Sequence, residues 1–154
     1  MLDAYLRIFG SDAIDNTAPQ PRSLQNVLLV DRRQHVAPRA RQLERYARDA
    51  LTVIGLTGET DVVTDGARIA TIRNGHPLMA RVTAMGCVAS ALVATCLAVE
   101  SDAWLATAAA LLAIGVAGEG AAARARGPGS FAMEFLDALD RLDRDALLAR
   151  AKVQ

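Results

Sequence analysis

The stretch that decides the fold is "TVIGLTGETDVVTDGARIATI", residues 52–72. Its opening run, "TVIGLT" (52–57), is short and mostly apolar, and Gly58 ends it. Unbroken apolar runs of this length are typical of strands that are buried in a parallel sheet, whereas strands with one wet face alternate between apolar and polar residues. The run therefore predicts a buried strand.

The second half of the same stretch predicts a β-hairpin over residues 61–72. Two runs, "DVVT" (61–64) and "ARIATI" (67–72), flank the dipeptide Asp65-Gly66. This dipeptide is favoured in two-residue hairpin turns, because both central positions of the turn require a positive φ. The turn accounts for the Asp65 carboxylate without a catalytic role.

The second half of the chain is helical by pattern. Besides a helix toward the end of the chain, its small and apolar residues predict helices at about 86–99, 102–124 and 131–140. Asp102, next to Ser101, can cap the second of these helices. The segment "RGPGS" (126–130) ends that helix and starts the next one, with Ser130 as its N-cap.

The first third of the chain carries weaker patterns. Residues 2–9 could form a short helix, "TAPQPRS" (17–23) reads as a loop, and "NVLLV" (26–30) reads as a short strand. From Pro38 the spacing of apolar residues predicts an amphipathic helix to about Asp49. The order of elements indicates an α/β layered domain with a short sheet, a hairpin and a C-terminal helical layer.

Composition and charge exclude several classes of protein. The 154 residues suit one domain, and 52% apolar residues can form a sizeable core. The 17 basic residues balance the 17 acidic ones, so no electrostatic footprint points to a nucleic-acid partner. Cys87 and Cys96 would lie about 13 Å apart on one helix, too far for a disulfide. With no long apolar segment in its first residues, the sequence predicts a reduced, cytoplasmic protein.

Two apolar runs raise the alternative of a small membrane hairpin. Met85–Val99 and Ala103–Gly118 are separated only by "ESD". Each run is shorter than the roughly 20 residues that a membrane-spanning helix needs, and both are dominated by alanine. Two buried core helices are the preferred interpretation, and no membrane partner is expected.

The segment "VTAMGC" (82–87) places a glycine and a cysteine where an apolar helix begins. A helix N-terminus carries unsatisfied N–H groups and a partial positive charge, so it attracts anions, above all phosphates. The same field favours the thiolate form of a cysteine, which makes it a better base or nucleophile. Taken alone, the pattern also fits a buried cysteine that packs beside a tight turn.

Several separated motifs carry a more specific signal. In order they are "LTGETDVVTDGARIATIRNGHPLMARVTAMGC" (56–87), "SALVATCLAVE" (90–100) and "IGVAGEGAAARARGPGSFAMEFLDAL" (114–139). Together they resemble the C-terminal part of the bacterial hydroxyethylthiazole kinases of thiamine biosynthesis, which have a ribokinase-like fold. The resemblance covers about residues 46–142. It divides the chain into a divergent or remnant segment, residues 1–45, and the C-terminal part of a ribokinase-like kinase domain, residues 46–154.

The resemblance implies phosphoryl transfer from ATP, with magnesium, to the hydroxyethyl group of 4-methyl-5-(2-hydroxyethyl)thiazole. It implies that Cys87 stands where ribokinase-like enzymes usually carry an aspartate base, and that Thr57 contacts ATP at the end of a strand. The turn of Ala84, Met85 and Gly86 would supply N–H groups for the migrating phosphate and contacts to the substrate. The family's trimeric assembly implies a homo-oligomer.

Two departures from the family pattern leave an alternative function open. Ala84 replaces a glycine of the turn, and Met85 is expected to project a long side chain into the space of the phosphates. The family's N-terminal half, with the Asn-x-x-Glu element associated with magnesium, has no evident counterpart in the chain. The alternative is a non-catalytic remnant or assembly module of the same family.

Other polar residues are interpreted as structural. His76 in "NGHPL" reads as a surface or packing residue, and Glu59 reads as a solvated turn carboxylate. With two histidines and two cysteines so placed, no zinc site is indicated.

Overall fold

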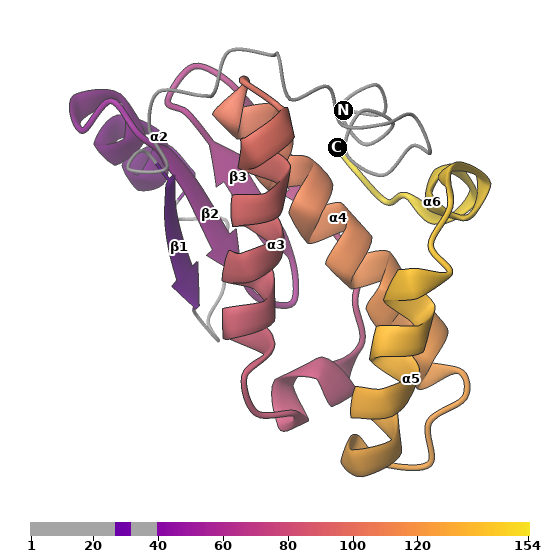
Figure 1. Cartoon of the computed structure of the whole chain (residues 1–154). Helices are drawn as coiled ribbons and strands as arrows, with labels where there is room; N and C mark the ends of the chain where they lie inside the picture. Colours follow the sequence, from indigo (N-terminus) through magenta and orange to yellow (C-terminus); the bar gives the residue numbers. More distant parts are fainter. Residues whose placement is uncertain (1–26, 32–39) are drawn as a thin grey trace.

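The computed structural model describes residues 27–31 and 40–154 (Figure 1). The short helix expected at residues 2–9 and the loop expected at 17–23 lie outside the described residues. The described residues form a sheet with helices packed against it, as the order of elements predicts.

The sheet contains β1 (Val27–Asp31), β2 (Val53–Thr57), β3 (Asp61–Thr64) and β4 (Ile69–Ile72), in that spatial order. β1 and β2 pair in parallel, whereas β2–β3 and β3–β4 are antiparallel pairs. The strands expected at residues 26–30 and 52–57 are confirmed, although β2 has a parallel neighbour on one side only. Both faces of β2 are buried, which explains its unbroken apolar run.

The β3–β4 hairpin is confirmed, but its turn is not the expected two-residue type. The connection runs from Asp65 to Arg68, and Gly66 is its one residue with a positive φ, +89°. The Asp65 carboxylate accepts hydrogen bonds from the backbone N–H groups of Ala67 (2.9 Å) and Arg68 (2.7 Å). Asp65 therefore shapes the turn through local hydrogen bonds and not through a left-handed conformation.

Helices form the rest of the described structure. They are α2 (Ala40–Asp49), the 3-10 helix η2 (Pro77–Arg81), α3 (Met85–Val99), α4 (Ala103–Ala122), α5 (Pro128–Asp140) and α6 (Arg144–Arg150). Asp102 caps α4 as expected, since its carboxylate accepts hydrogen bonds from two N–H groups of the first turn. The expectation that Ser130 is an N-cap is wrong. Pro128 already starts α5, and the Ser130 hydroxyl accepts a hydrogen bond from the N–H of Gly127 behind it.

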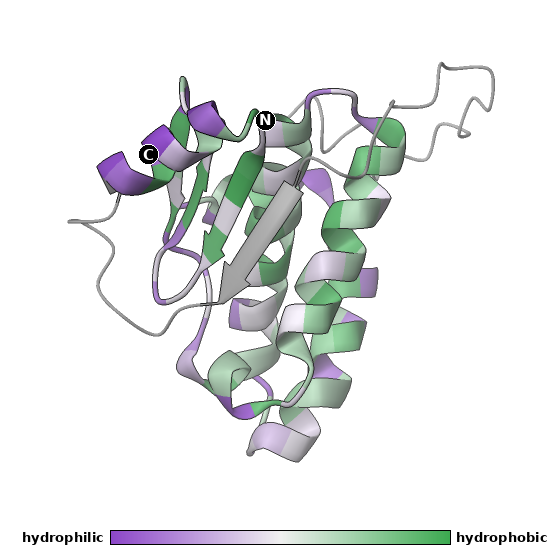
Figure 2. Cartoon of the chain, turned by 90° about the vertical axis from the view of Figure 1, so that its left-hand side faces the viewer, coloured by the Kyte–Doolittle hydropathy of each residue, from purple (hydrophilic) through white to green (hydrophobic). Residues whose placement is uncertain are grey.

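The domain has three layers (Figure 2). α2 lies on one face of the sheet, and α4 lies on the other face, flanked by α3 and α5. Because side chains alternate along a strand, β3 directs Val63 toward α4 and Val62 away from it, and both are buried. Val63, Ile72 and Phe131 belong to the core cluster that surrounds α4. The predicted α/β layered domain is confirmed.

α4 is longer than the apolar run Ala103–Gly118, because it continues to Ala122. By length and composition alone, this one helix of the described chain could cross a membrane. Most of it is buried inside the domain, against α3, α5 and the sheet. Its uniformly apolar surface is that of a central core helix, as the preferred interpretation of the sequence requires.

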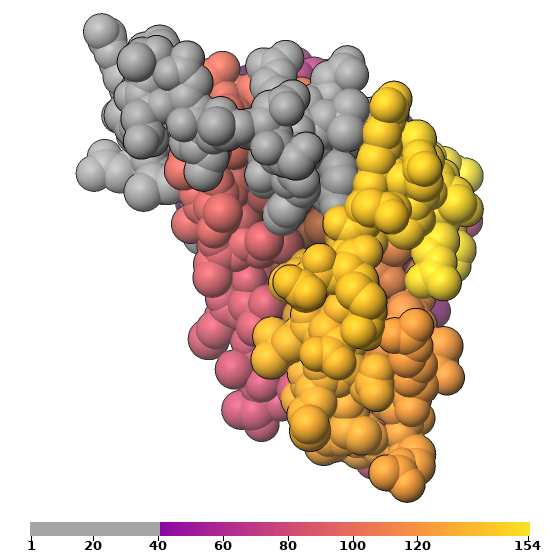
Figure 3. All heavy atoms as spheres, turned by 45° about the vertical axis from the view of Figure 1, so that its right-hand side comes forward, coloured from indigo at the N-terminus to yellow at the C-terminus, as the bar shows by residue number. Residues whose placement is uncertain are grey.

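The C-terminal segment returns to the edge of the sheet beside β4. The backbones of Gln154 and Thr71 exchange two hydrogen bonds, of 2.8 and 3.0 Å. The amide oxygen of the buried Asn74 accepts a 2.7 Å hydrogen bond from the N–H of Lys152, whose ammonium group lies 2.9 Å from Glu119 on α4. This flank of the molecule is therefore formed by α5, α6 and the last residues (Figure 3).

Candidate active site at the carboxyl end of the sheet

The carboxyl ends of β1 and β2 and the first turn of α3 lie at the same end of the domain (Figure 1). Thr57, the last residue of β2, is half-buried and pairs in parallel with Asp31, the last residue of β1. The antiparallel pairing of β2 and β3 runs to Leu56–Val62, and Asp61 begins β3 three residues after Gly58. Ligands of α/β sheets bind outside the carboxyl ends of the strands, so Thr57 occupies a position where a ligand is expected.

The first turn of α3 is open to solvent and has no side-chain cap. Ala84 precedes the helix in the left-handed conformation, with φ +72° and ψ 8°, and its methyl group cannot accept a hydrogen bond. Apart from its chain neighbours and the nearby backbone of its own helix, no atom lies within 4 Å of the position that a Cβ would take at the exposed Gly86. Uncapped N–H groups beside open space are suited to binding an anion.

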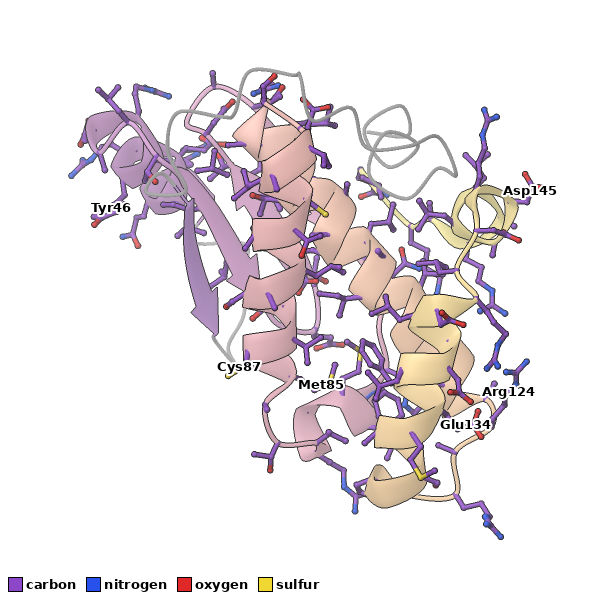
Figure 4. The ribbon with its side chains drawn as sticks, viewed as in Figure 1. Tyr46, Met85, Cys87, Arg124, Glu134 and Asp145 are labelled. Atoms are coloured by element: carbon purple, nitrogen blue, oxygen red, sulfur yellow. The ribbon has the colours of Figure 1, made fainter. Side chains whose placement is uncertain are left out.

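The side chains of Cys87 and Met85 point to opposite sides of this turn (Figure 4). Cys87 is exposed and its thiol is free, whereas Met85 is half-buried and packs against the core cluster. Residues two apart on a helix point about 200° away from each other, so exposing one turns the other inward. The Met85 side chain therefore turns toward the core cluster and does not project freely from the turn.

Comparison with known proteins identifies the family of the chain. The model of the hydroxyethylthiazole kinase family matches residues 25–145, which include the whole sheet, Thr57 and the first turn of α3. The chain belongs to the hydroxyethylthiazole kinase family. The match begins before the first of the separated motifs, so β1 and α2 fall within it.

Named relatives support the assignment and define its extent. A hydroxyethylthiazole kinase of Granulibacter bethesdensis is 52% identical over 106 residues, which are 69% of this chain and 39% of the relative. One of Rhizobium etli is 46% identical over 125 residues, 80% of this chain and 48% of the relative. The solved structure of the protein from Pyrococcus horikoshii has a TM-score of 0.72 and 36% identity, covering 77% of this chain and 46% of that one.

The chain thus spans less than half the length of these hydroxyethylthiazole kinases and corresponds to their C-terminal part. The structural likeness confirms the ribokinase-like layered fold that the motifs imply.

Asp61 is a residue of this hydroxyethylthiazole kinase domain that sequence reasoning missed. Its Oδ1 accepts a 2.9 Å hydrogen bond from the N–H of Gly58, the residue after Thr57. Burial raises the pKa of Asp61 to about 7, although the hydrogen bond from Gly58 acts in the opposite direction. Asp61 is half-buried, whereas a polar first residue of a strand is ordinarily exposed, so the sequence pattern carries no sign of this partial burial.

The second cysteine of α3 is chemically distinct from Cys87. Cys96 is fully buried, and this burial raises its pKa to about 12. Both thiols are free, as their spacing along one helix predicts. Of the two, only Cys87 is placed to meet a ligand.

Two other predicted roles can be compared with the structure. The His76 ring nitrogen Nδ1 accepts a 3.2 Å hydrogen bond from the N–H of Leu78 and caps η2, so its structural interpretation is confirmed. Glu59 is an exposed turn residue. Within the described part of the chain, no group of three or more His, Cys, Asp or Glu side chains could hold a metal ion.

Proposed function

We propose that the chain takes part in the ATP-dependent phosphorylation of the hydroxyethyl group of 4-methyl-5-(2-hydroxyethyl)thiazole, in thiamine biosynthesis or salvage in the cytoplasm. The observation that carries this proposal is the exposed Cys87 on the uncapped first turn of α3. That turn lies at the end of the domain where β2 presents Thr57, in a chain of the hydroxyethylthiazole kinase family.

Each part of the site has a role in this chemistry. The acceptor hydroxyl oxygen forms a bond to the γ-phosphorus of ATP, the bond from that phosphorus to the bridging oxygen of ADP breaks, and the hydroxyl proton passes to the thiolate of Cys87. The N–H groups at Ala84, Met85 and Gly86 stabilise the charge on the transferred group, and Thr57 holds the nucleotide.

The donor groups fit a nucleotide phosphate but not the family's metal. Uncapped helix N–H groups, an open glycine and a strand-end hydroxyl are suitable partners for phosphate oxygens. Magnesium prefers carboxylate oxygens and water in octahedral geometry, and the described residues contain no acidic cluster that could provide them. No step is therefore assigned to a metal held by the described residues.

The family resemblance also bears on assembly. We propose a homo-oligomer, a trimer by family resemblance. Light scattering that showed a stable, well-folded monomer would contradict it.

The catalytic proposal is tested by ADP release with Mg-ATP and the thiazole alcohol. Wild type should turn over, and Cys87→Ala should lose most of the rate, by roughly 10²-fold or more, because general-base assistance is removed. Thr95→Ala is the matched control, since Thr95 is exposed on α3 two turns away and its hydroxyl bonds only within the helix. Absence of turnover above blank at high enzyme concentration would reject catalysis by this chain.

A second candidate is a non-catalytic assembly module of the same family. It is favoured because the described residues contain no acidic cluster that could hold the family's metal. Calorimetric titration with Mg-ATP distinguishes the candidates. A nucleotide-binding chain should show millimolar or tighter binding, whereas a module without a nucleotide site should show none.

A further inference from the structure

We propose that Asp61 is a positioning residue for the nucleotide: its carboxyl group holds the Thr57–Gly58 peptide at the carboxyl end of β2. This inference rests on the proposed function and extends it to a residue that has no assigned role. Asp61 does not need to touch the ligand, because it acts through the backbone that carries Thr57.

The first support is the hydrogen bond across the β2–β3 loop. The N–H of Gly58 donates to Asp61 Oδ1 at 2.9 Å, so the carboxyl group closes the short loop between the two strands. Gly58 directly follows Thr57, so this hydrogen bond fixes the peptide group that leaves Thr57.

The second support is the face of the sheet on which Asp61 lies. Asp61 pairs with Ile72, and residues that pair across a ladder point to the same face. Ile72 belongs to the core cluster around α4, as does Val63, two residues along β3. Asp61 therefore lies on the helix-covered face, the same face as Thr57 by the alternation of β2, and on the side of the sheet that carries the first turn of α3.

The third support is a comparison of the two ends of β3. Asp65, at the far end, also bonds to backbone N–H groups of a turn, but it does so where Arg68 and solvent stabilise its charge. Partial burial opposes ionisation of Asp65, yet the hydrogen bonds of Arg68 and Ala67 and the Arg68 charge lower its pKa overall. Asp61 makes a similar turn bond, yet desolvation raises its pKa, so ionisation is opposed at Asp61 and favoured at Asp65.

The charge state of Asp61 is compatible with a neighbouring phosphate. A carboxyl group with a pKa of about 7 carries only part of a negative charge at neutral pH. It therefore repels an anionic ligand less than an ordinary ionised aspartate would. An exposed carboxylate at this position would oppose phosphate binding.

The test measures Mg-ATP affinity by calorimetry in wild type, Asp61→Ala, Asp61→Asn and Asp65→Ala. We expect Asp61→Ala to weaken binding about tenfold, because it removes the hydrogen bond that holds the Gly58 N–H. Asp61→Asn should stay within about threefold of wild type, because its Oδ1 still accepts from Gly58. Asp65→Ala should lower the melting temperature and leave the affinity unchanged, since it removes turn bonds at the other end of the strand.

The outcomes separate this inference from the proposed function. If wild type binds Mg-ATP and folded Asp61→Ala binds equally well, the positioning role is overturned while the nucleotide site stands. Equal weakening in Asp65→Ala would also overturn it, because loss of stability would then explain the effect. Absence of binding in wild type would overturn the proposed function and the inference together.

Discussion

Ala84 has a strained backbone conformation at the candidate site. It is in the left-handed region, φ +72°, where the Cβ of an L-residue is crowded and glycine is not. We predict that Ala84→Gly stabilises the domain by about 1 kcal/mol, because it removes this strain and restores the glycine of the family turn. Urea unfolding followed by circular dichroism measures the change.

The control for this prediction is Ala91→Gly. Ala91 is exposed in the interior of α3, where glycine costs about 1 kcal/mol relative to alanine. The two substitutions have the same chemistry and opposite expected signs. Destabilisation by both would show that the turn at residue 84 is not strained.

Asp61 should make the stability of the domain depend on pH. Its pKa of about 7 in the folded state lies above the ordinary value of 3.8, so the folded state holds the proton more tightly than the unfolded chain. The free energy of unfolding should therefore fall as pH rises from about 4 to about 7 and remain lower above that range. Asp61→Asn should remove this decline and gain on the order of 2 kcal/mol at pH 8.

The measurement is urea unfolding at several pH values, with the variant subtracted from wild type. Asp65 and Asp102 have lowered pKa values, so their stabilising effect is present at neutral pH and is lost in acid. Both remain in the variant, and the difference isolates Asp61. A difference that did not change between pH 5 and pH 8 would contradict the raised pKa.

At the scale of elements, two glycines of α4 decide how closely it packs. A Cβ at Gly115 would lie 2.7 Å from the carbonyl oxygen of Asn74, whereas a Cβ at Gly118 would meet the flexible side-chain end of Met79. Gly115→Ala should therefore destabilise the domain by roughly 2 kcal/mol, because backbone must move. Gly118→Ala should be near neutral, since Met79 can rearrange and alanine favours the helix by about 1 kcal/mol.

These two variants form a matched pair, because both place the same methyl group on the same helix. Thermal unfolding followed by circular dichroism compares them. Equal loss in both would mean that helix packing as a whole, and not the approach of the Asn74 backbone, limits the residue size at these positions.

At the scale of the whole molecule, the last four residues hold β4 and α4 together. Removal of residues 151–154 deletes the backbone hydrogen bonds of Thr71 and Arg73 to this segment and one partner of the buried Asn74. At about 1 kcal/mol for each of these four bonds, we expect a loss of about 4 kcal/mol. Lys152→Met is the control, because it removes only the partly exposed ion pair with Glu119, worth about 1 kcal/mol or less.

Thermal unfolding of the truncated chain and of Lys152→Met measures this contribution. An equal shift in the two would assign the effect to the ion pair. A truncated chain as stable as wild type would show that the strand-like pairing beside β4 does not hold the domain together.

Much of the fold is predictable from the sequence because the signals are local. The apolar run of β2, the hairpin around Asp65-Gly66 and the Asp102 cap act within a few residues of themselves, and each is found where the pattern places it. The ordered motifs from residue 56 onward likewise identify the hydroxyethylthiazole kinase family, because order and spacing are properties of the chain. The same motifs point to Thr57 and Cys87 as candidate site residues.

Other features depended on contacts between residues far apart in the chain. The burial of Asp61 and its pKa follow from the helices that cover one face of the sheet, and the inward turn of Met85 follows from the core cluster of α4. Neither the periodicity of apolar residues nor the choice of turn residues predicts which tertiary neighbour packs against a side chain. By itself the sequence determined the elements, their order and the family. Only tertiary structure decided the surroundings that raise the pKa of Asp61, because desolvation is a property of the packed layers.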